Sequence, residues 1–340
     1  MVNVLITRRI PAAAGYLRAA GCTVTEWPHE NRAMPHAEIV KQAANVDGIL
    51  CMLSDTIDKT VLRQCVRVVW LGNAASPHPP LRSDRLRVVS TLSVGYDHVD
   101  VAEATARGVR VGHTPGVLSN ACAELTVGLL LAVSRRIVES SRSAADGTWG
   151  TWSLYGYSGG PLRGKTVGIV GLGGIGASVA SILAGGFGCS VLYSGPREKP
   201  DVAATIPGGA RHVPFEELLA RSDVVSAHCP ATPETAGLFN AEAFALMKPS
   251  AFFVNTTRGS LVVQEDLAAA LRGGTIAGAG LDVTSPEPLP PSHDLYTIPN
   301  LVVLPHIASA DTPTRDAMLD MSLENLRCGL EGTPLQACAN

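Results

Sequence analysis

The sequence lacks the patterns that mark several common classes of protein. None of its eight cysteines stands in a C-x-x-C pair, so neither a zinc site nor a dithiol redox site is indicated. No uncharged apolar run reaches the roughly 18 residues that a membrane-spanning helix needs. The formal net charge is −3, which favours neither nucleic acid nor an acidic membrane surface as a partner. We therefore expect no metal, no nucleic-acid partner and no membrane partner.

The sequence also lacks the features of a targeting segment. It opens on the strand-like run Val2–Thr7, where a secretory signal would show basic residues, a longer apolar stretch and a small-residue cleavage site. The last three residues do not form a peroxisomal signal. Several cysteines lie in apolar runs, as Cys51 does, which is typical of small buried side chains in a reducing compartment. We therefore expect a cytoplasmic protein.

The sequence does contain a regular alternation of β-branched and helical segments. With 340 residues, of which 46% are hydrophobic and 17% charged, it predicts a folded protein of two domains. Alternation of strands and helices predicts parallel sheets covered on both faces. Strands are predicted at residues 2–7, 22–27, 47–53, 86–91 and 109–113, and then at 166–170, 190–193, 223–227, 251–255, 276–281 and 301–304.

These segments predict an α/β fold with two doubly wound parallel-sheet domains. The first is a flavodoxin-like substrate (catalytic) domain over residues 1–113, completed by residues 307–340. The second is a Rossmann NAD(P)-binding domain over residues 114–306, since six strands with helices between them make a complete domain of this kind. A last helix, predicted at 312–330, is expected to return and cover the first domain.

One stretch does not fit the alternation. Residues 66–71 nearly repeat residues 86–91, and the segment 72–85 between them is rich in proline, serine and arginine. The stretch is either an extra surface loop or an insertion relative to simpler relatives, and the sequence leaves both interpretations open.

A glycine motif indicates a dinucleotide site. Residues 171–176 read G-L-G-G-I-G, between the predicted strand 166–170 and a helical stretch that begins at Ala177. In such a turn the first glycine permits the tight bend, the second lets the backbone approach a pyrophosphate, and the third lets helix and strand pack closely. The helix N-terminus adds unpaired N–H groups and partial positive charge. The candidate phosphate-binding residues are Gly171, Leu172, Gly173, Gly174, Ile175 and Gly176.

The end of the next predicted strand indicates which dinucleotide is preferred. An NAD-selective protein usually has Asp or Glu there to bind the ribose 2′-hydroxyl. This chain has Ser194, and Arg197 and Lys199 follow closely. A hydroxyl and two cations attract a 2′-phosphate that a carboxylate would repel, so we expect NADP(H), with NAD(H) as the alternative. The candidate residues at this point are Ser194, Gly195, Pro196 and Arg197.

Three polar residues are candidates for catalysis. Arg258 and His306 come just after predicted strands, and Glu287 follows a third strand by a few residues. Ligands bind outside the carboxyl ends of strands in open α/β sheets. Reduction of a ketone needs a proton donor poised near neutrality, and histidine is the usual one. A neighbouring carboxylate stabilises its imidazolium, and a guanidinium can bind a substrate carboxylate.

Together these motifs resemble those of the D-isomer-specific 2-hydroxyacid dehydrogenases. The resemblance is carried by residues 171–176, 255–259, 280–283, 286–288 and 305–306, and it covers nearly the whole chain. It implies that His306 is the acid/base, Glu287 its partner and Arg258 the substrate clamp. It also implies that Ser93, Val94 and Gly95 bind the substrate carboxylate through backbone N–H groups. Further residues that it implies are Ser309 at the substrate and Cys229, Pro230, Thr256, Arg258 and Asp282 at the cofactor.

Within that family the chain is most similar to the glyoxylate and hydroxypyruvate reductases. Residues 92–98, 193–195 and 281–290 and a loop with two tryptophans carry this likeness. It implies a small 2-oxo or 2-hydroxy acid as substrate and NADPH as reductant. Two alternatives stay open: another dehydrogenase of the family with a different substrate, and a dinucleotide-sensing binding protein like the related co-repressors.

The region 121–160 is the candidate interface for a homodimer. A long apolar helix is predicted over 121–143, followed by a loop that holds Trp149, Trp152, Tyr155 and Tyr157. Aromatic clusters beside an apolar helix are enriched at protein interfaces. The family resemblance also implies a homodimer built on this region. We further hypothesise that Trp152 reaches the partner's active site and narrows it to fit small acids.

Overall fold

The computed structural model describes residues 1–64, 66–69 and 81–340, and the chain divides into two compact units. Unit 1 comprises Met1–Leu118 and Thr312–Asn340, and unit 2 comprises Ser119–Asp311. Over the described ranges, no helix combines the length and apolar character that crossing a bilayer requires.

Unit 1 is built on a five-stranded sheet in the order β2-β1-β3-β6-β7, and every neighbouring pair is parallel. This is the flavodoxin-like order that was predicted. Its strands are β1 (Asn3–Ile6), β2 (Thr23–Glu26), β3 (Gly48–Cys51), β6 (Val88–Thr91) and β7 (Arg110–Gly112). Its helices are α1 (Pro11–Ala19), α2 (His36–Ala43), α3 (Lys59–Gln64), α4 (Val101–Ala106) and α12 (Thr312–Glu331).

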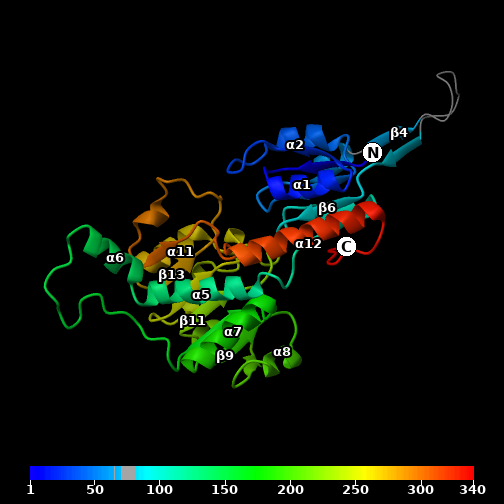
Figure 1. Ribbon diagram of the computed structural model, residues 1–340. Coiled ribbons are helices and arrows are strands. Elements are labelled where there is room, and N and C mark those ends of the chain that lie inside the picture. The colour runs from blue at the N-terminus through cyan, green and yellow to red at the C-terminus, as the bar shows by residue number, and fades with distance from the viewer. Residues whose placement is uncertain (65, 70–80) are drawn as a thin grey trace. The chain divides into compact units, whose positions relative to one another are not determined.

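The C-terminal helix α12 packs on the sheet of unit 1, as expected, and lies along β6 in Figure 1. Leu323 and Leu326 join Val4 and Val88 in one apolar cluster. A methyl group on Gly329 would come within 2.3 Å of Val88 Cβ, so the absence of a side chain there lets the helix approach the strand closely.

The segment that did not fit the alternation contains a separate antiparallel pair, β4 (Val66–Val69) and β5 (Leu81–Asp84). The pair forms its own two-stranded sheet and adds no strand to the parallel sheet of unit 1. The choice between an extra surface loop and an insertion stays open for the stretch as a whole, and its residues 70–80 lie outside the described residues.

Unit 2 is built on a seven-stranded parallel sheet in the order β10-β9-β8-β11-β12-β13-β14. It contains the Rossmann order, with helices on both faces. The strands are β8 (Thr166–Val170), β9 (Ser190–Ser194), β10 (Ala210–His212), β11 (Val224–Ala227), β12 (Phe252–Asn255), β13 (Gly278–Leu281) and β14 (Leu301–Val303). The helices are α5 (Ser119–Ser134), α6 (Ile137–Ala145), α7 (Gly174–Phe187), α8 (Pro200–Ala204), α9 (Phe215–Arg221), α10 (Ala241–Leu246) and α11 (Gln264–Arg272), with 3₁₀ turns η1 (Gly259–Leu261) and η2 (Asp294–Thr297).

Both faces of this sheet are buried, because neighbouring residues of a central strand enter different apolar clusters. Val224 of β11 packs in one cluster with Leu130 of α5, and Val225 packs in the other with Phe253. Strands buried on both faces read as continuous apolar runs, which is why the sequence pattern found them. The exception is β10, which was not predicted: its three residues are only half-buried or exposed and carry no apolar pattern.

The prediction of one helix over 121–143 is wrong, since two helices, α5 and α6, occupy that stretch. Arg136 between them has φ 53°, a left-handed conformation that ends α5. The carbonyl of Ser134 accepts a hydrogen bond at 2.8 Å from Gly160 N, which replaces a bond along the helix. The guanidinium of Arg136 bonds Glu139 in the first turn of α6 at 2.8 and 2.6 Å.

The turn after β8 packs directly on the end of β11. A methyl group on Gly171, whose φ is 100°, would lie 2.6 Å from Cys229 N and 2.7 Å from the carbonyl carbon of His228. Partly buried His228 has its Nε2 2.8 Å from Ser226 Oγ, and its Cβ lies beneath Gly176. Loss of hydration lowers the pKa of His228 to about 4.

We expect this histidine to make the protein less stable in mild acid. The unfolded chain takes up a proton below about pH 6.5, whereas folded His228 stays neutral to about pH 4, so stability falls as the pH drops between these values. Between pH 7 and pH 5 the free energy of unfolding should fall by about 2 kcal/mol from this group. Urea unfolding at both pH values should give a smaller fall for His228→Asn. The exposed His29→Asn is the matched control, and an unchanged fall in His228→Asn contradicts the assignment.

Candidate active site

The carboxyl ends of six strands form one row along an edge of the unit 2 sheet. The pairing aligns Ser194, Val170, Ala227, Asn255, Leu281 and Val303 across neighbouring strands. Each residue that follows a strand therefore emerges at the same edge. This register explains why motifs far apart in the sequence gather at one edge of unit 2.

The glycine turn at this edge is shaped to receive a phosphate. A methyl group on Gly176 would lie 2.3 Å from Gly171 O, whereas one on Gly173 would meet open space. Hydrogen bonding along α7 begins with Ala177 N donating to Gly173 O at 2.9 Å, so the three preceding N–H groups come before the first intrahelical bond. An open approach and unpaired donors at a helix N-terminus fit the pyrophosphate of a dinucleotide.

Two cations follow the end of β9 beside this turn. The backbone carbonyl of Ser194, a residue with a buried side chain, accepts from Gly171 N at 2.9 Å. The ammonium of Lys199 donates to Leu172 O at 3.0 Å, which holds a positive charge at the glycine turn. Arg197 is exposed on the same loop, and Gly195 O accepts from His212 Nε2 at 3.1 Å. The loop after β9 therefore carries two cations, of which Lys199 is held at the glycine turn.

His306 and Glu287 form a hydrogen-bonded pair across two strand-end loops. Nδ1 of His306 lies 3.0 Å from Glu287 Oε1, and because a carboxylate only accepts, Nδ1 carries the proton. The Nε2 atom is then the ring nitrogen that can give or take a proton. The imidazole is 18% exposed and the carboxylate 35% exposed, so a small ligand can reach the pair.

Asp282 holds the turn that carries His306. Its two carboxylate oxygens accept from Ile307 N at 2.8 Å and Ala308 N at 2.7 Å, while its carbonyl accepts from His306 N at 2.8 Å. Burial raises the pKa of Asp282, although the two N–H donors oppose the shift. These contacts stabilise the left-handed backbone of His306, whose φ is 55°. The carboxylate expected at the cofactor is thus engaged with the backbone.

The loop after β12 presents Arg258. Asn255, a buried residue that sequence reasoning did not select, donates from Nδ2 to Arg258 O at 2.8 Å and accepts at Oδ1 from Thr257 N at 3.0 Å. Its place at a strand end was the available signal. Thr256 Oγ1 lies 2.9 Å from Thr126 Oγ1 of α5, which ties the loop to that helix.

Three further predicted residues of unit 2 follow β11 or β14, whereas Trp152 lies in the exposed loop after α6. Cys229 is buried against Gly171, and burial raises the pKa of its thiol to about 11. Pro230 follows it and is exposed. Ser309 is buried in the turn that Asp282 holds.

In unit 1 the predicted carboxylate-binding turn follows β6. Each of its carbonyls has a partner within the unit: Ser93 O accepts from Thr114 N at 2.9 Å, Val94 O from His113 Nδ1 at 2.9 Å, and Gly95 O from Ser93 Oγ at 2.5 Å. Bonds to all three carbonyls fix the backbone of residues 93–95.

Comparison with known proteins places the chain in one family. Residues 127–308 match the model described as "D-isomer specific 2-hydroxyacid dehydrogenase, NAD binding domain". The chain is 43% identical over 335 residues to "Glyoxylate reductase/hydroxypyruvate reductase" of Mus musculus, covering 98% of this chain and 96% of that protein.

Solved structures agree with this result. The TT0316 protein from Thermus thermophilus is 42% identical, with a TM-score of 0.86 and full coverage of both chains. An NADPH-dependent glyoxylate/hydroxypyruvate reductase from Sinorhizobium meliloti, solved with NADP and malonate, is 29% identical, with a TM-score of 0.82 over 99% of this chain and 96% of that chain. The chain therefore belongs to the D-isomer specific 2-hydroxyacid dehydrogenases, a family of NAD(P)-dependent oxidoreductases.

Proposed function

We propose that this protein reduces glyoxylate and hydroxypyruvate to glycolate and D-glycerate, with NADPH as the preferred reductant. The observation that carries the proposal is the 3.0 Å pair of His306 and Glu287 at the edge that also bears the glycine turn. The names of relatives at 37–43% identity support the substrate class. Unit 2 is the proposed NAD(P)-binding domain and unit 1 the proposed substrate domain.

The proposed mechanism assigns one task to each side chain. A nicotinamide dinucleotide held at the glycine turn would supply the hydride. His306 donates the Nε2 proton to the carbonyl oxygen as negative charge develops there. Glu287 fixes the tautomer and stabilises the imidazolium, and Arg258 binds the substrate carboxylate. The N–H groups of Val94 and Gly95 and the hydroxyl of Ser309 complete the proposed set for the substrate.

Substitution of the proposed acid tests the chemical step. His306→Gln should lower kcat about 10²- to 10⁴-fold, because the proton donor is lost while the phosphate site is untouched. NADPH absorbance with glyoxylate gives kcat, and NADPH fluorescence gives a Kd that should stay within about twofold. Arg258→Lys should lower kcat/KM at least about tenfold, since a point charge cannot bind both carboxylate oxygens. Near wild-type turnover in His306→Gln would contradict the mechanism.

The proposed preference for NADPH is supported by the charges after β9. Ser194 stands where a carboxylate would repel the 2′-phosphate, and the ammonium of Lys199 is held at Leu172 O. Arg197 adds a second cation on the same loop. The remaining cofactor residues named above, including Pro230 and Thr256, belong to the same proposal.

A carboxylate at position 194 should reverse the coenzyme preference. Ser194→Asp should raise the NADH-to-NADPH ratio of kcat/KM by at least about tenfold, because two anions then face each other. Ser190→Asp, at the exposed start of the same strand, is the matched control and should leave the ratio unchanged. A wild type that already prefers NADH tenfold would refute this part of the proposal.

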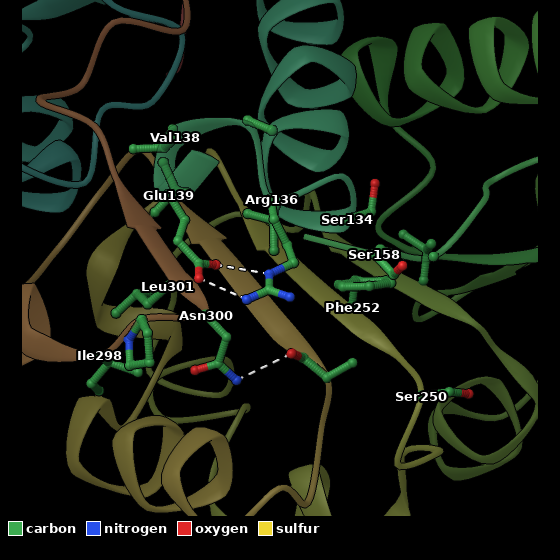
Figure 2. A pocket seen from close by; sticks show the side chains of 18 of the residues that line it. Ser134, Arg136, Val138, Glu139, Ser158, Ser250, Phe252, Ile298, Asn300 and Leu301 are labelled. Carbon is green, nitrogen blue, oxygen red and sulfur yellow. Dashed lines mark hydrogen bonds and ion pairs between the residues drawn. The ribbon is translucent and has the colours of Figure 1, made fainter. Parts of the chain in front are cut away.

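We also propose a homodimer through the region 121–160, in particular through α6 and the loop of residues 146–158. No residue of α6 is buried within the chain, and the loop exposes Trp149 and Tyr155. Beside α6 lies a cavity of about 780 Å³, where Figure 2 shows the Arg136–Glu139 pair facing Asn300. A second copy would bury these apolar side chains. Trp152, 80% exposed, is proposed to reach the partner's site and narrow it.

The oligomeric state tests this interface. Ile137, at the start of α6, is half-exposed, and Ile137→Glu should convert the dimer to a monomer because a charge cannot be buried unpaired. Leu246→Glu, on α10, is a control of similar exposure that should leave the dimer intact. Size-exclusion chromatography with light scattering measures both. A monomeric wild type, or a dimeric Ile137→Glu, would refute the proposed interface.

A further inference from the structure

The loop that carries Glu287 is largely exposed, so something must hold its carboxylate against His306. Residues 285–288 are all exposed, and Glu287 is bonded to His306 across two loops. A flexible glutamate in an exposed loop loses conformational entropy when it is held in one rotamer. A pair maintained at 3.0 Å therefore needs a loop whose backbone is fixed from outside.

Gln264 supplies one fixed point. It is the first residue of α11, is 5% exposed, and directs both ends of its carboxamide to one residue of the loop. Oε1 accepts from Ser285 N at 2.8 Å, and Nε2 donates to Ser285 O at 2.7 Å. The carboxamide thus satisfies both the backbone N–H and the backbone carbonyl of Ser285, as a paired residue on a neighbouring β-strand does. Figure 1 shows α11 beside the segment that follows β13.

Gly259 supplies a second fixed point, at the peptide bond between Thr284 and Ser285. A methyl group on Gly259 would lie 2.0 Å from Thr284 O, 2.1 Å from Thr284 C and 2.7 Å from Ser285 N. The backbone that follows Arg258 therefore touches the peptide between Thr284 and Ser285. Thr284 Oγ1 also donates to Pro286 O at 2.8 Å, which closes the turn just before Glu287.

We infer that Gln264 is a positioning residue for the reaction, which acts by fixing the Ser285 peptide and so holding Glu287 against His306. The inference rests on the proposed function, in which that pair is the acid–base group. Gln264 is distant in sequence from both members of the pair, and its effect passes through the backbone. Its removal leaves the N–H and carbonyl of Ser285 without their partner, and the loop then relaxes to satisfy them elsewhere.

The pH dependence of reduction separates this role from general packing. Without the Glu287 anion the protonated His306 loses its counter-charge, so Glu287→Gln should move the pH at which reduction is half-lost to lower values. Gln264→Leu should move it in the same direction, by about half a pH unit or more, and lower kcat about tenfold. Gln264→Glu keeps the acceptor for Ser285 N and should show a smaller change of the same kind.

The control and the double variant complete the experiment. Leu271→Ala loosens the buried face of the same helix without touching Ser285, and should lower the melting temperature but leave the pH midpoint unchanged. In the Glu287→Gln background, Gln264→Leu should change kcat less than about twofold, since its target is already gone. Saturating NADPH is used throughout, and NADPH affinity should be the same in all variants.

The outcomes distinguish the two proposals. Suppose that Glu287→Gln lowers the pH midpoint as expected, but that adding Gln264→Leu to it lowers kcat a further tenfold. This result overturns the role of Gln264 and leaves the acid–base pair standing. The same midpoint shift in Leu271→Ala also overturns that role. A wild-type pH profile in Glu287→Gln overturns the proposed acid–base pair and this inference with it. If Gln264→Leu does not fold, Gln264→Glu must show the same dependence on Glu287, and independence overturns the inference.

Discussion

Direct contact between backbone segments, at two glycines, determines the geometry of the unit 2 site. Gly171 touches the backbone at His228 and Cys229, and Gly259 touches the peptide between Thr284 and Ser285. Neither position has room for a methyl group, so main-chain packing locates both turns. Main chain packed against main chain has few alternative arrangements. The glycine turn, Arg258 and the Glu287 loop are therefore positioned within unit 2 by contacts of the main chain itself.

Buried polar side chains support these turns from within. Asp282 accepts two backbone N–H bonds, and Asn255 both accepts and donates in the loop of Arg258. Burying an unpaired carboxylate or amide is costly, but each of these groups is matched by backbone donors or acceptors. Such residues hold the reacting groups without being the reacting groups. For the proposed acid His306, the backbone of the turn fixes the position of the ring as much as its hydrogen bond to Glu287 does.

The region of α6 and the following loop is not held by such buried contacts. Here the chain exposes large apolar side chains beside a cavity. Within a single copy these side chains stay in contact with water and contribute no hydrophobic stabilisation. The break at Arg136 creates this arrangement, because a straight helix would continue where α6 now turns away from α5. In the proposed dimer, the break places α6 where it can contact the second copy.

The sequence by itself determined the two parallel sheets, the glycine turn and the positions of Arg258, Glu287 and His306. It could do so because central strands are continuous apolar runs, and the residues after them emerge at one edge of a parallel sheet. The three-residue strand β10 carries no such pattern and was missed. Only the tertiary structure decided the break of the predicted helix, since the Ser134 carbonyl is taken by Gly160 from beyond the aromatic loop. It also decided that Gln264 meets Ser285 and that Asp282 holds the turn of His306. Each of these contacts joins residues far apart in the chain, and local residue patterns contain no information on which distant backbone group a polar side chain will meet.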